Sequence, residues 1–197
     1  MIYLTQTSRR LVAVVAILIV AVTACGSSDR ATEAPAFLEV GPSTLGVGDD
    51  VPVPVGDVVL TISGEISNPN VDDTLQFDME ALESLGLIEY SVDDYQAEGR
   101  VASFRGVPVR SVLEIAGAST DVEVLNTIAL NDYEVEIPVA DVTDYPVMIA
   151  TSVDGERMPV DAYGPTRIIY PSSSFELDEA VYGPRWIWQL TRIEVSQ

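Results

Sequence analysis

The sequence contains no histidine and no lysine, and its only cysteine is Cys25. Without histidine it cannot form a Ser-His-Asp triad or an imidazole metal site. Without lysine it has no Schiff-base amine and no phosphate-binding P-loop lysine. A single cysteine also excludes an internal disulfide. Carboxylates, tyrosine, arginine, serine and threonine remain as candidates for chemistry.

Positive charge is scarce as well. The chain has 31 acidic residues against 10 arginines, which gives a net charge of −21. Removal of residues 1–24 would take away two arginines and no acid, so that the charge becomes 8 − 31 = −23. Such a surface repels phosphate backbones and anionic headgroups, which excludes nucleic acid as a partner.

The first 24 residues have the layout of a secretory signal. Arg9 and Arg10 precede an uncharged apolar run over residues 11–22, and small residues lead up to Cys25. Val22-Thr23-Ala24-Cys25 resembles a bacterial lipobox, which predicts lipidation of Cys25 and a membrane anchor. The alternative is an ordinary signal peptide followed by a chance cysteine. We expect an exported, lipid-anchored protein of the cell envelope, on the outer face of the plasma membrane or in the periplasm.

The remaining chain divides at about residue 56. Residues 25–56 are rich in Gly, Pro, Ser, Ala and Asp without helical or strand periodicity, which predicts a flexible tether. Residues 57–197 are patterned as one folded domain.

Short strands dominate that domain. Helices are predicted after Asp78, which can cap, and after Pro108, with Gly86 and Gly117 as their ends. The predicted strands cover residues 58–66, 100–104, 122–130, 133–137, 147–153, 157–160, 167–170 and 186–195. Many short strands with two or three short helices predict an α+β fold.

Six segments occur in the order of a known family. They are Leu60-Thr61-Ile62-Ser63-Gly64, Phe104-Arg105-Gly106-Val107-Pro108-Val109, residues 131–138 (NDYEVEIP), residues 148–159 (MIATSVDGERMP), residues 164–171 (GPTRIIYP) and residues 186–195 (WIWQLTRIEV). Together they resemble the oxidoreductase molybdopterin-binding domain, which has the fold of sulfite oxidase. The resemblance covers about residues 57–195 and implies a β-rich sulfite-oxidase-type fold with a few short helices.

The same resemblance bears on the cofactor. In catalytic members a cysteine upstream of the Gly-Val-Pro segment ligates molybdenum through its thiolate, but the corresponding stretch, Tyr90 to Arg100, contains none. Tyr, Asp and Glu do not replace a soft molybdenum–thiolate bond. The chain is closest to a short branch without this cysteine. We therefore expect no metal site and no cofactor, although the resemblance leaves molybdopterin open.

A candidate ligand site follows from the scarce cations and from the family positions. Guanidinium groups suit phosphate or carboxylate, and aromatic rings stack on planar ligands. The candidate residues are Arg100, Asp132, Tyr133, Arg167, Tyr170, Arg185 and Trp186.

Each candidate also has a structural interpretation. Arg167 would instead pair with an acid, and Asn131-Asp132 would serve as a turn. Trp186 and Trp188 alternate along a strand, so that one is core and the other a half-exposed cover. The pairs Asp49-Asp50, Asp72-Asp73 and Asp93-Asp94 lack the spacing of a calcium loop and are interpreted as solvated loop charge.

Two functional hypotheses remain. The first is a membrane-tethered, non-catalytic module that binds a small anion or an envelope protein partner. The second is a genuine molybdopterin oxidoreductase that holds its cofactor without a protein thiolate.

Overall fold

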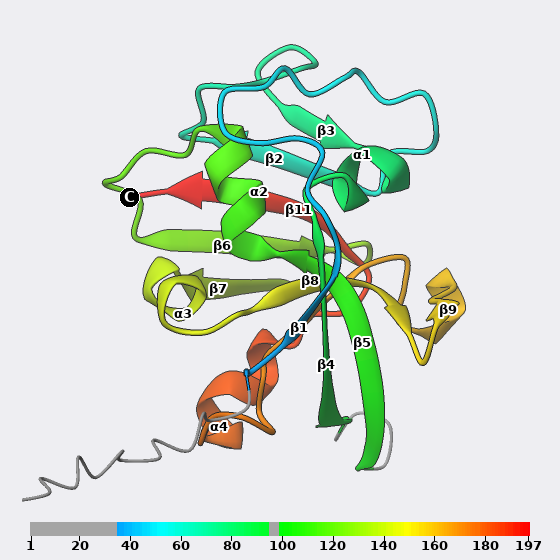
Figure 1. Cartoon of the computed structure of the whole chain (residues 1–197). Coiled ribbons are helices and arrows are strands. Elements are labelled where there is room, and N and C mark those ends of the chain that lie inside the picture. Colours follow the sequence, from blue (N-terminus) through cyan, green and yellow to red (C-terminus); the bar gives the residue numbers. More distant parts are fainter. Residues whose placement is uncertain (1–34, 95–98) are drawn as a thin grey trace, which may run out of the picture. The chain divides into compact units, whose positions relative to one another are not determined.

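Two β-sheets form the framework of the protein in a computed structural model, which describes residues 35–94 and 99–197 (Figure 1). In the first sheet the strand order is β1, β4, β5, β8 and β10, with β9 paired to β8, and every pair is antiparallel. These strands are β1 (Leu38–Gly41), β4 (Leu87–Asp94), β5 (Arg100–Pro108), β8 (Met148–Val153), β9 (Glu156–Arg157) and β10 (Arg167–Ile169).

The second sheet brings an early strand and the last strand of the chain together. Its order is β3 (Leu75–Phe77), β2 (Leu60–Gly64), β11 (Leu190–Ser196), β6 (Val124–Ala129) and β7 (Glu134–Pro138). β2 and β11 are parallel, with Ile62 opposite Ile193, and the other pairs are antiparallel. In Figure 1 the long strands β4 and β5 run across the direction of this sheet.

Short helices fill the connections. They are α1 (Met79–Glu83), α2 (Val109–Ala116), α3 (Val139–Asp144), α4 (Glu179–Tyr182) and the 3₁₀ turns η2 (Val160–Ala162) and η3 (Gly183–Arg185). Helix α2 follows Pro108 and ends at Gly117, whose left-handed conformation has φ 61°. Its buried residues are Val109, Val112, Leu113, Ile115 and Ala116. No helix among the described residues is long and apolar enough to cross a membrane.

One hydrophobic core joins the two sheets and α2. Leu60, Ile62, Phe104 and Ile193 are fully buried within it. Among the largest buried side chains is a cation, Arg167, which is 2% exposed. The predicted α+β architecture is confirmed, because the described chain is mostly β-structure with a few short helices.

The structure corrects the boundary of the tether. A flexible segment through residue 56 was predicted, but β1 pairs with β4, with Leu38 opposite Glu89, and Val51 is buried in the core. Residues 35–56 therefore contribute to the folded domain. Residues 35–56 show no clear periodicity in the sequence because their only named strand is β1, which is four residues long, and the rest of the segment is held by isolated contacts. Residues 1–34, with the predicted signal and Cys25, lie outside the described residues.

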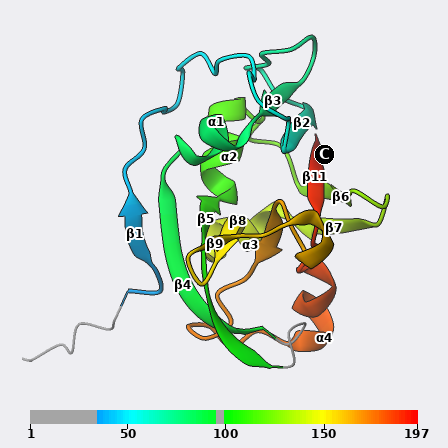
Figure 2. The same cartoon turned by 90° about the vertical axis from the view of Figure 1, so that its right-hand side faces the viewer.

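Asp78 caps α1 and also binds the backbone of the loop that precedes β2. Its Oδ1 accepts a hydrogen bond from the amide of Ala81 at 2.9 Å, and Oδ2 accepts from the amides of Val55 and Gly56 at 3.0 and 3.1 Å (Figure 2 shows α1 beside the loop before β2). These amides, that of Ala81 first, lower the pKa of Asp78 below its ordinary value of 3.8.

We expect Asp78→Ala to lower the free energy of unfolding by about 1–2 kcal/mol at neutral pH, as a lost N-cap does. Because the folded-state pKa is depressed, the carboxylate contributes stability above its unfolded pKa, and this contribution is lost as the pH falls through the folded value. Urea unfolding at pH 7 and pH 3 measures both effects. The Asp78→Asn variant keeps one acceptor and should show a smaller loss with a weaker dependence on pH; equal stability of all three proteins would contradict the cap.

Candidate functional site

Arg167 lies at the start of β10 with its side chain in the core rather than at the surface. Its Nη1 is 3.1 Å from Oδ2 of Asp94, and its Nη2 is 3.3 Å from Oδ1, so the guanidinium meets the carboxylate as a two-pronged fork. Asp94 ends β4 and is 2% exposed. The guanidinium carbon lies 5.1 Å from the ring centre of Phe104 and 5.4 Å from that of Tyr163. The ion pair is therefore enclosed by aromatic rings.

A second buried acid holds Tyr170 and Arg185. Oδ2 of Asp141, in α3, accepts from the Tyr170 hydroxyl at 2.8 Å and from Nη1 of Arg185 at 2.6 Å. Burial, and then the hydrogen bond to Asp141, raise the pKa of Tyr170 far above its ordinary value, so the phenol stays protonated. The Arg185 guanidinium carbon also lies 5.2 Å from the ring centre of Tyr182. Both candidate residues thus have structural partners.

The other charged candidates are on the surface. Arg100, at the start of β5, pairs with Asp154, which lies in the turn between β8 and β9. Both side chains are about half exposed. Asp132 has a φ of 60° in the β6–β7 turn, as turn chemistry predicts, and lies 3.4 Å from Arg192. Arg100 lies opposite Asp94 in the β4–β5 ladder, but the carboxylate that it pairs with is Asp154.

Almost all of the described arginines have a carboxylate partner within the protein. Of the seven that fall within the described residues, six pair with a carboxylate, and the seventh, Arg110, donates to the carbonyl of Thr143. The structure therefore favours the structural interpretation of Arg167 and Arg185 over their use in binding an anion.

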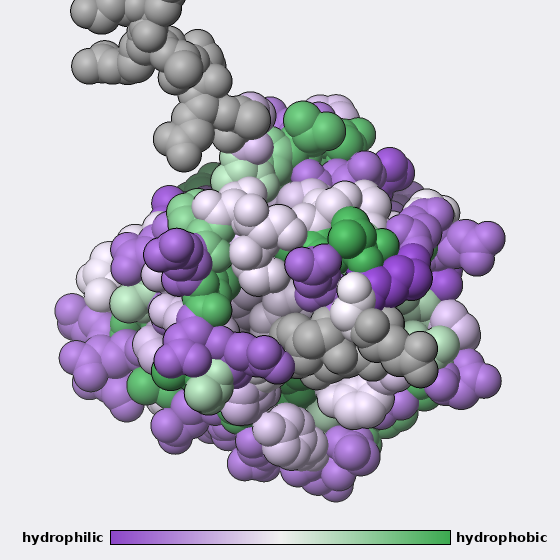
Figure 3. All heavy atoms as spheres, turned by 90° about the horizontal axis from the view of Figure 1, so that it is seen from below, coloured by the Kyte–Doolittle hydropathy of each residue, from purple (hydrophilic) through white to green (hydrophobic). Residues whose placement is uncertain are grey.

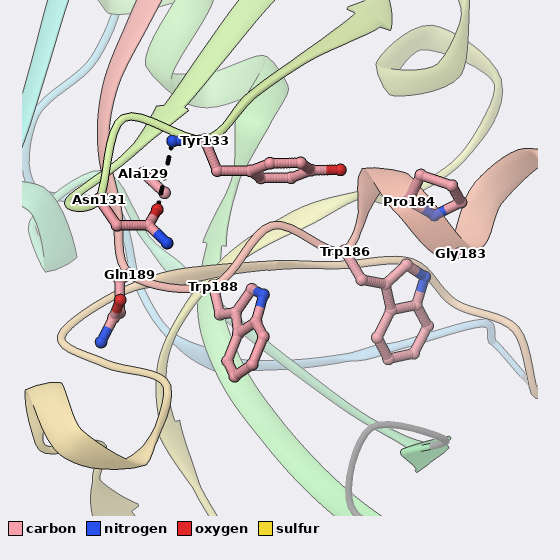
Figure 4. A pocket seen from close by; sticks show the side chains of 8 residues that line it. All are labelled: Ala129, Asn131, Tyr133, Gly183, Pro184, Trp186, Trp188 and Gln189. Carbon is pink, nitrogen blue, oxygen red and sulfur yellow. Dashed lines mark hydrogen bonds between the residues drawn. The ribbon is translucent and has the colours of Figure 1, made fainter.

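Two candidates do meet at a cavity. A hollow of about 370 Å³ opens between the β6–β7 turn and the segment that leads into β11 (Figure 4). Tyr133, which is 45% exposed, and Trp186, which is 2% exposed, both line it. The remaining lining residues are Ala129, Asn131, Gly183, Pro184, Trp188 and Gln189. The lining contains three aromatic rings and no charged side chain.

The sequence interpretation missed some residues and foresaw others. Asp94 was assigned to solvated loop charge, which is wrong, because it occupies an inward position of β4. The signal was present: Ile88, Tyr90, Val92 and Asp94 alternate along one face of the strand. By contrast, Trp186 is core and Trp188 is 44% exposed, so the predicted division of the two tryptophans is confirmed.

The residues present do not fit a thiolate-ligated molybdenum centre. The sequence from β4 to β5 contains no cysteine, and the described residues contain no cluster of three or more His, Cys, Asp or Glu side chains that could hold a metal ion. The nearby guanidinium groups, which would suit a pterin phosphate, are paired with Asp94 and Asp141. We derive no chemical step through such a cofactor.

Comparison with known proteins begins with the fold. The crystal structure of the sulfane dehydrogenase SoxCD from Paracoccus pantotrophus is similar, with a TM-score of 0.53 and 18% sequence identity. The match covers 70% of this chain and 37% of that chain, and at this identity it shows the fold alone. The two sheets with few short helices therefore define a single-domain protein of the sulfite-oxidase-type fold.

The sequence then gives the family. The profile described as "Oxidoreductase molybdopterin binding domain" matches residues 51–197, and the chain belongs to that family. A search of curated proteins found no significant match.

Proposed function

We propose that the protein is a lipid-anchored, extracytoplasmic member of this family that works by binding rather than by molybdenum redox chemistry. Family membership supplies the scaffold, and the side chains determine what the scaffold can do. The observation that carries the proposal is the buried Arg167–Asp94 pair at the end of a hairpin whose sequence has no cysteine.

Two physical reasons support this interpretation. A protein thiolate is the soft ligand expected for this kind of centre, and no residue type in the hairpin replaces it. In addition, Asp94 already gives Arg167 a bidentate carboxylate, so an incoming anion would have to displace a buried partner. For this reason the small anion expected at Arg167 is not part of the proposal.

The binding surface is instead the aromatic hollow beside Tyr133 and Trp188. Exposed Leu130 and Val160 lie next to its lining, since Leu130 donates its amide to the carbonyl of Gln189 and the side-chain amide of Gln189 donates to the carbonyl of Val160. Exposed aromatic and aliphatic side chains around a hollow are typical of binding surfaces. Figure 3 shows one face of the molecule, on which hydrophilic side chains are interspersed with hydrophobic ones.

The metal content of the purified protein tests the non-catalytic role. We expect the full chain, produced in a host that makes molybdopterin, to contain no stoichiometric molybdenum and to release no fluorescent pterin oxidation product. A thiolate-bearing member of the family, produced in the same host, is the control and should contain both. Stoichiometric molybdenum in this protein would instead support the oxidoreductase.

Anchoring is tested separately at Cys25. We expect Cys25→Ser to leave the precursor uncleaved or to move the protein into the soluble fraction, because the acyl chains attach to this sulfur. Detergent partitioning and the mass of the mature N-terminus measure the change. Ser27→Ala is the matched control and should partition like the wild type; a Cys25→Ser protein that is cleaved and still partitions like the wild type would refute the anchor.

A further inference from the structure

The aromatic hollow has three properties that together indicate a class of ligand. The first is the accessibility of its rings. Tyr133 is 45% exposed and Trp188 is 44% exposed, whereas Trp186 forms the buried wall. In Figure 4 the ring of Tyr133 extends across the hollow toward Pro184, with the two indoles on the opposite side. Aromatic side chains thus line the hollow on two sides.

The rings are also held in place. Tyr163 packs against Trp188 with ring centres 4.6 Å apart, and Tyr163 itself lies beside the buried guanidinium of Arg167. The amide of Gln189 donates to the carbonyl of Tyr163 at 3.0 Å, and Gln189 has a φ of 53°. A non-glycine residue with positive φ persists where its surroundings enforce it. The position of Trp188 is therefore fixed by packing and by the backbone, although the side chain is partly exposed.

The second property is that each of the two side-chain amides of the lining has one polar atom engaged inside the protein. Nε2 of Gln189 donates to the carbonyl of Val160 at 2.6 Å, and Oδ1 of Asn131 accepts from the amide of Tyr133 at 3.2 Å. These two bonds reduce the number of side-chain partners left for a sugar, which needs several hydrogen bonds. A ligand that needs ring faces rather than hydrogen bonds fits better.

The third property is charge. The hollow has no charged lining residue, but exposed acids flank it in sequence: Asp132 and Glu134 beside Tyr133, and Asp161 beside Val160. One cation, Arg192, pairs with Asp132. The whole chain carries a net charge of −21, so its field attracts cations and repels anions.

We propose that this hollow binds a small organic cation with a methylated ammonium head, held over the faces of Tyr133 and Trp188. Such a head has no N–H group that needs an acceptor, and ring faces attract it electrostatically. A volume of about 370 Å³ lies in the lower part of the range of small-molecule sites. The inference rests on the proposed function, because it names the ligand class for a protein that works by binding.

Choline and its uncharged isostere 3,3-dimethyl-1-butanol form a matched pair of probes. The two tryptophans of the chain both line the hollow, so intrinsic fluorescence reports binding directly. We expect choline to change the fluorescence saturably and the isostere to bind at least about fivefold more weakly, as loss of a cation–ring attraction predicts. Equal binding of both probes would show that only apolar contact holds the ligand, and would overturn the proposal. Tighter binding of a lysine-rich peptide than of choline would also overturn it.

Variants locate the site. Tyr133→Phe keeps the ring face and should bind choline like the wild type, whereas Tyr133→Leu keeps apolar bulk without the face and should bind about five- to tenfold more weakly. Trp188→Leu, measured by calorimetry because it loses a reporter, should show a similar loss. Phe175→Leu, outside the lining, is the control. Unchanged binding by both leucine variants at an unchanged melting temperature would overturn the proposal.

The two proposals fail separately. Molybdenum-free protein that does not bind choline would overturn this inference and leave the non-catalytic role intact. Molybdenum-loaded protein that binds choline through Tyr133 would support the inference and overturn the proposed function.

Discussion

Replacing Arg167 with alanine is expected to lower the melting temperature by roughly 6–20 °C. Removal of one partner of a buried ion pair typically costs about 3–5 kcal/mol, because the other charge stays buried and uncompensated. For a folded unit of this size each kcal/mol lowers the melting temperature by about 2–4 °C. Asp94 would be the stranded charge, since it is 2% exposed. Thermal and urea unfolding measure the loss.

Two further variants distinguish the loss of the Arg167–Asp94 ion pair from non-specific destabilisation. Arg167→Met combined with Asp94→Leu replaces both charges by apolar side chains, and should recover most of the lost stability, as such replacements are often neutral. Arg100→Ala breaks the exposed pair with Asp154 and should leave the melting temperature almost unchanged. If Arg167→Ala melted like the wild type and instead lost affinity for an inorganic anion, Arg167 would be a ligand-binding residue after all.

Replacing Gly106 with alanine is expected to destabilise the protein by about 3 kcal/mol or more. A Cβ on Gly106 would overlap the carbonyl oxygen of Ile149 and crowd the Cα of Ala150, both on the neighbouring strand β8. Backbone atoms inside a sheet cannot move aside as a flexible side chain can, so β5 and β8 would have to separate. We therefore expect the loss of stability to be at the upper end of the range that overpacking usually causes.

Gly46→Ala is the control for Gly106. The only atom near its added Cβ is Oδ2 of Asp49, at an ordinary distance of 3.9 Å. We expect this variant to unfold within about 0.5 kcal/mol of the wild type, as most surface substitutions do. A Gly106→Ala protein with wild-type stability would show that β5 and β8 do not approach each other as closely as the structure has them.

The motif glycines illustrate how far local sequence can be interpreted. Gly106 and Gly164 belong to segments that resemble the family, but the sequence does not say why glycine is needed there. At Gly164 an added Cβ would overlap the carbonyl of Met158, a backbone atom from the same loop between β9 and β10. At Gly106 the requirement comes from the approach of β8, a strand distant in sequence, and at Gly164 it comes from the way the loop turns back on itself.

The same distinction holds for the candidate site. Arg167 and Asp94 are separated by 73 residues in sequence, and Arg185 and Asp141 by 44. Their interaction depends on how β4, β10 and α3 are arranged around the core. The sequence could identify the arginines as scarce and notable, but it could not determine whether a ligand or an internal carboxylate meets each of them. The aromatic hollow likewise joins residues 129–133 to residues 183–189.

Features that depend on residue chemistry or on neighbouring residues could be predicted from the sequence. These include the absence of a thiolate between β4 and β5, the cap at Asp78, the span of α2 between Pro108 and Gly117, and the division of Trp186 from Trp188. Tertiary structure alone decided the partner of every buried charge, the ordering of residues 35–56 and the existence of the hollow. The physical reason is that backbone preference and side-chain periodicity act over a few residues, whereas burial and pairing depend on which distant segments pack together.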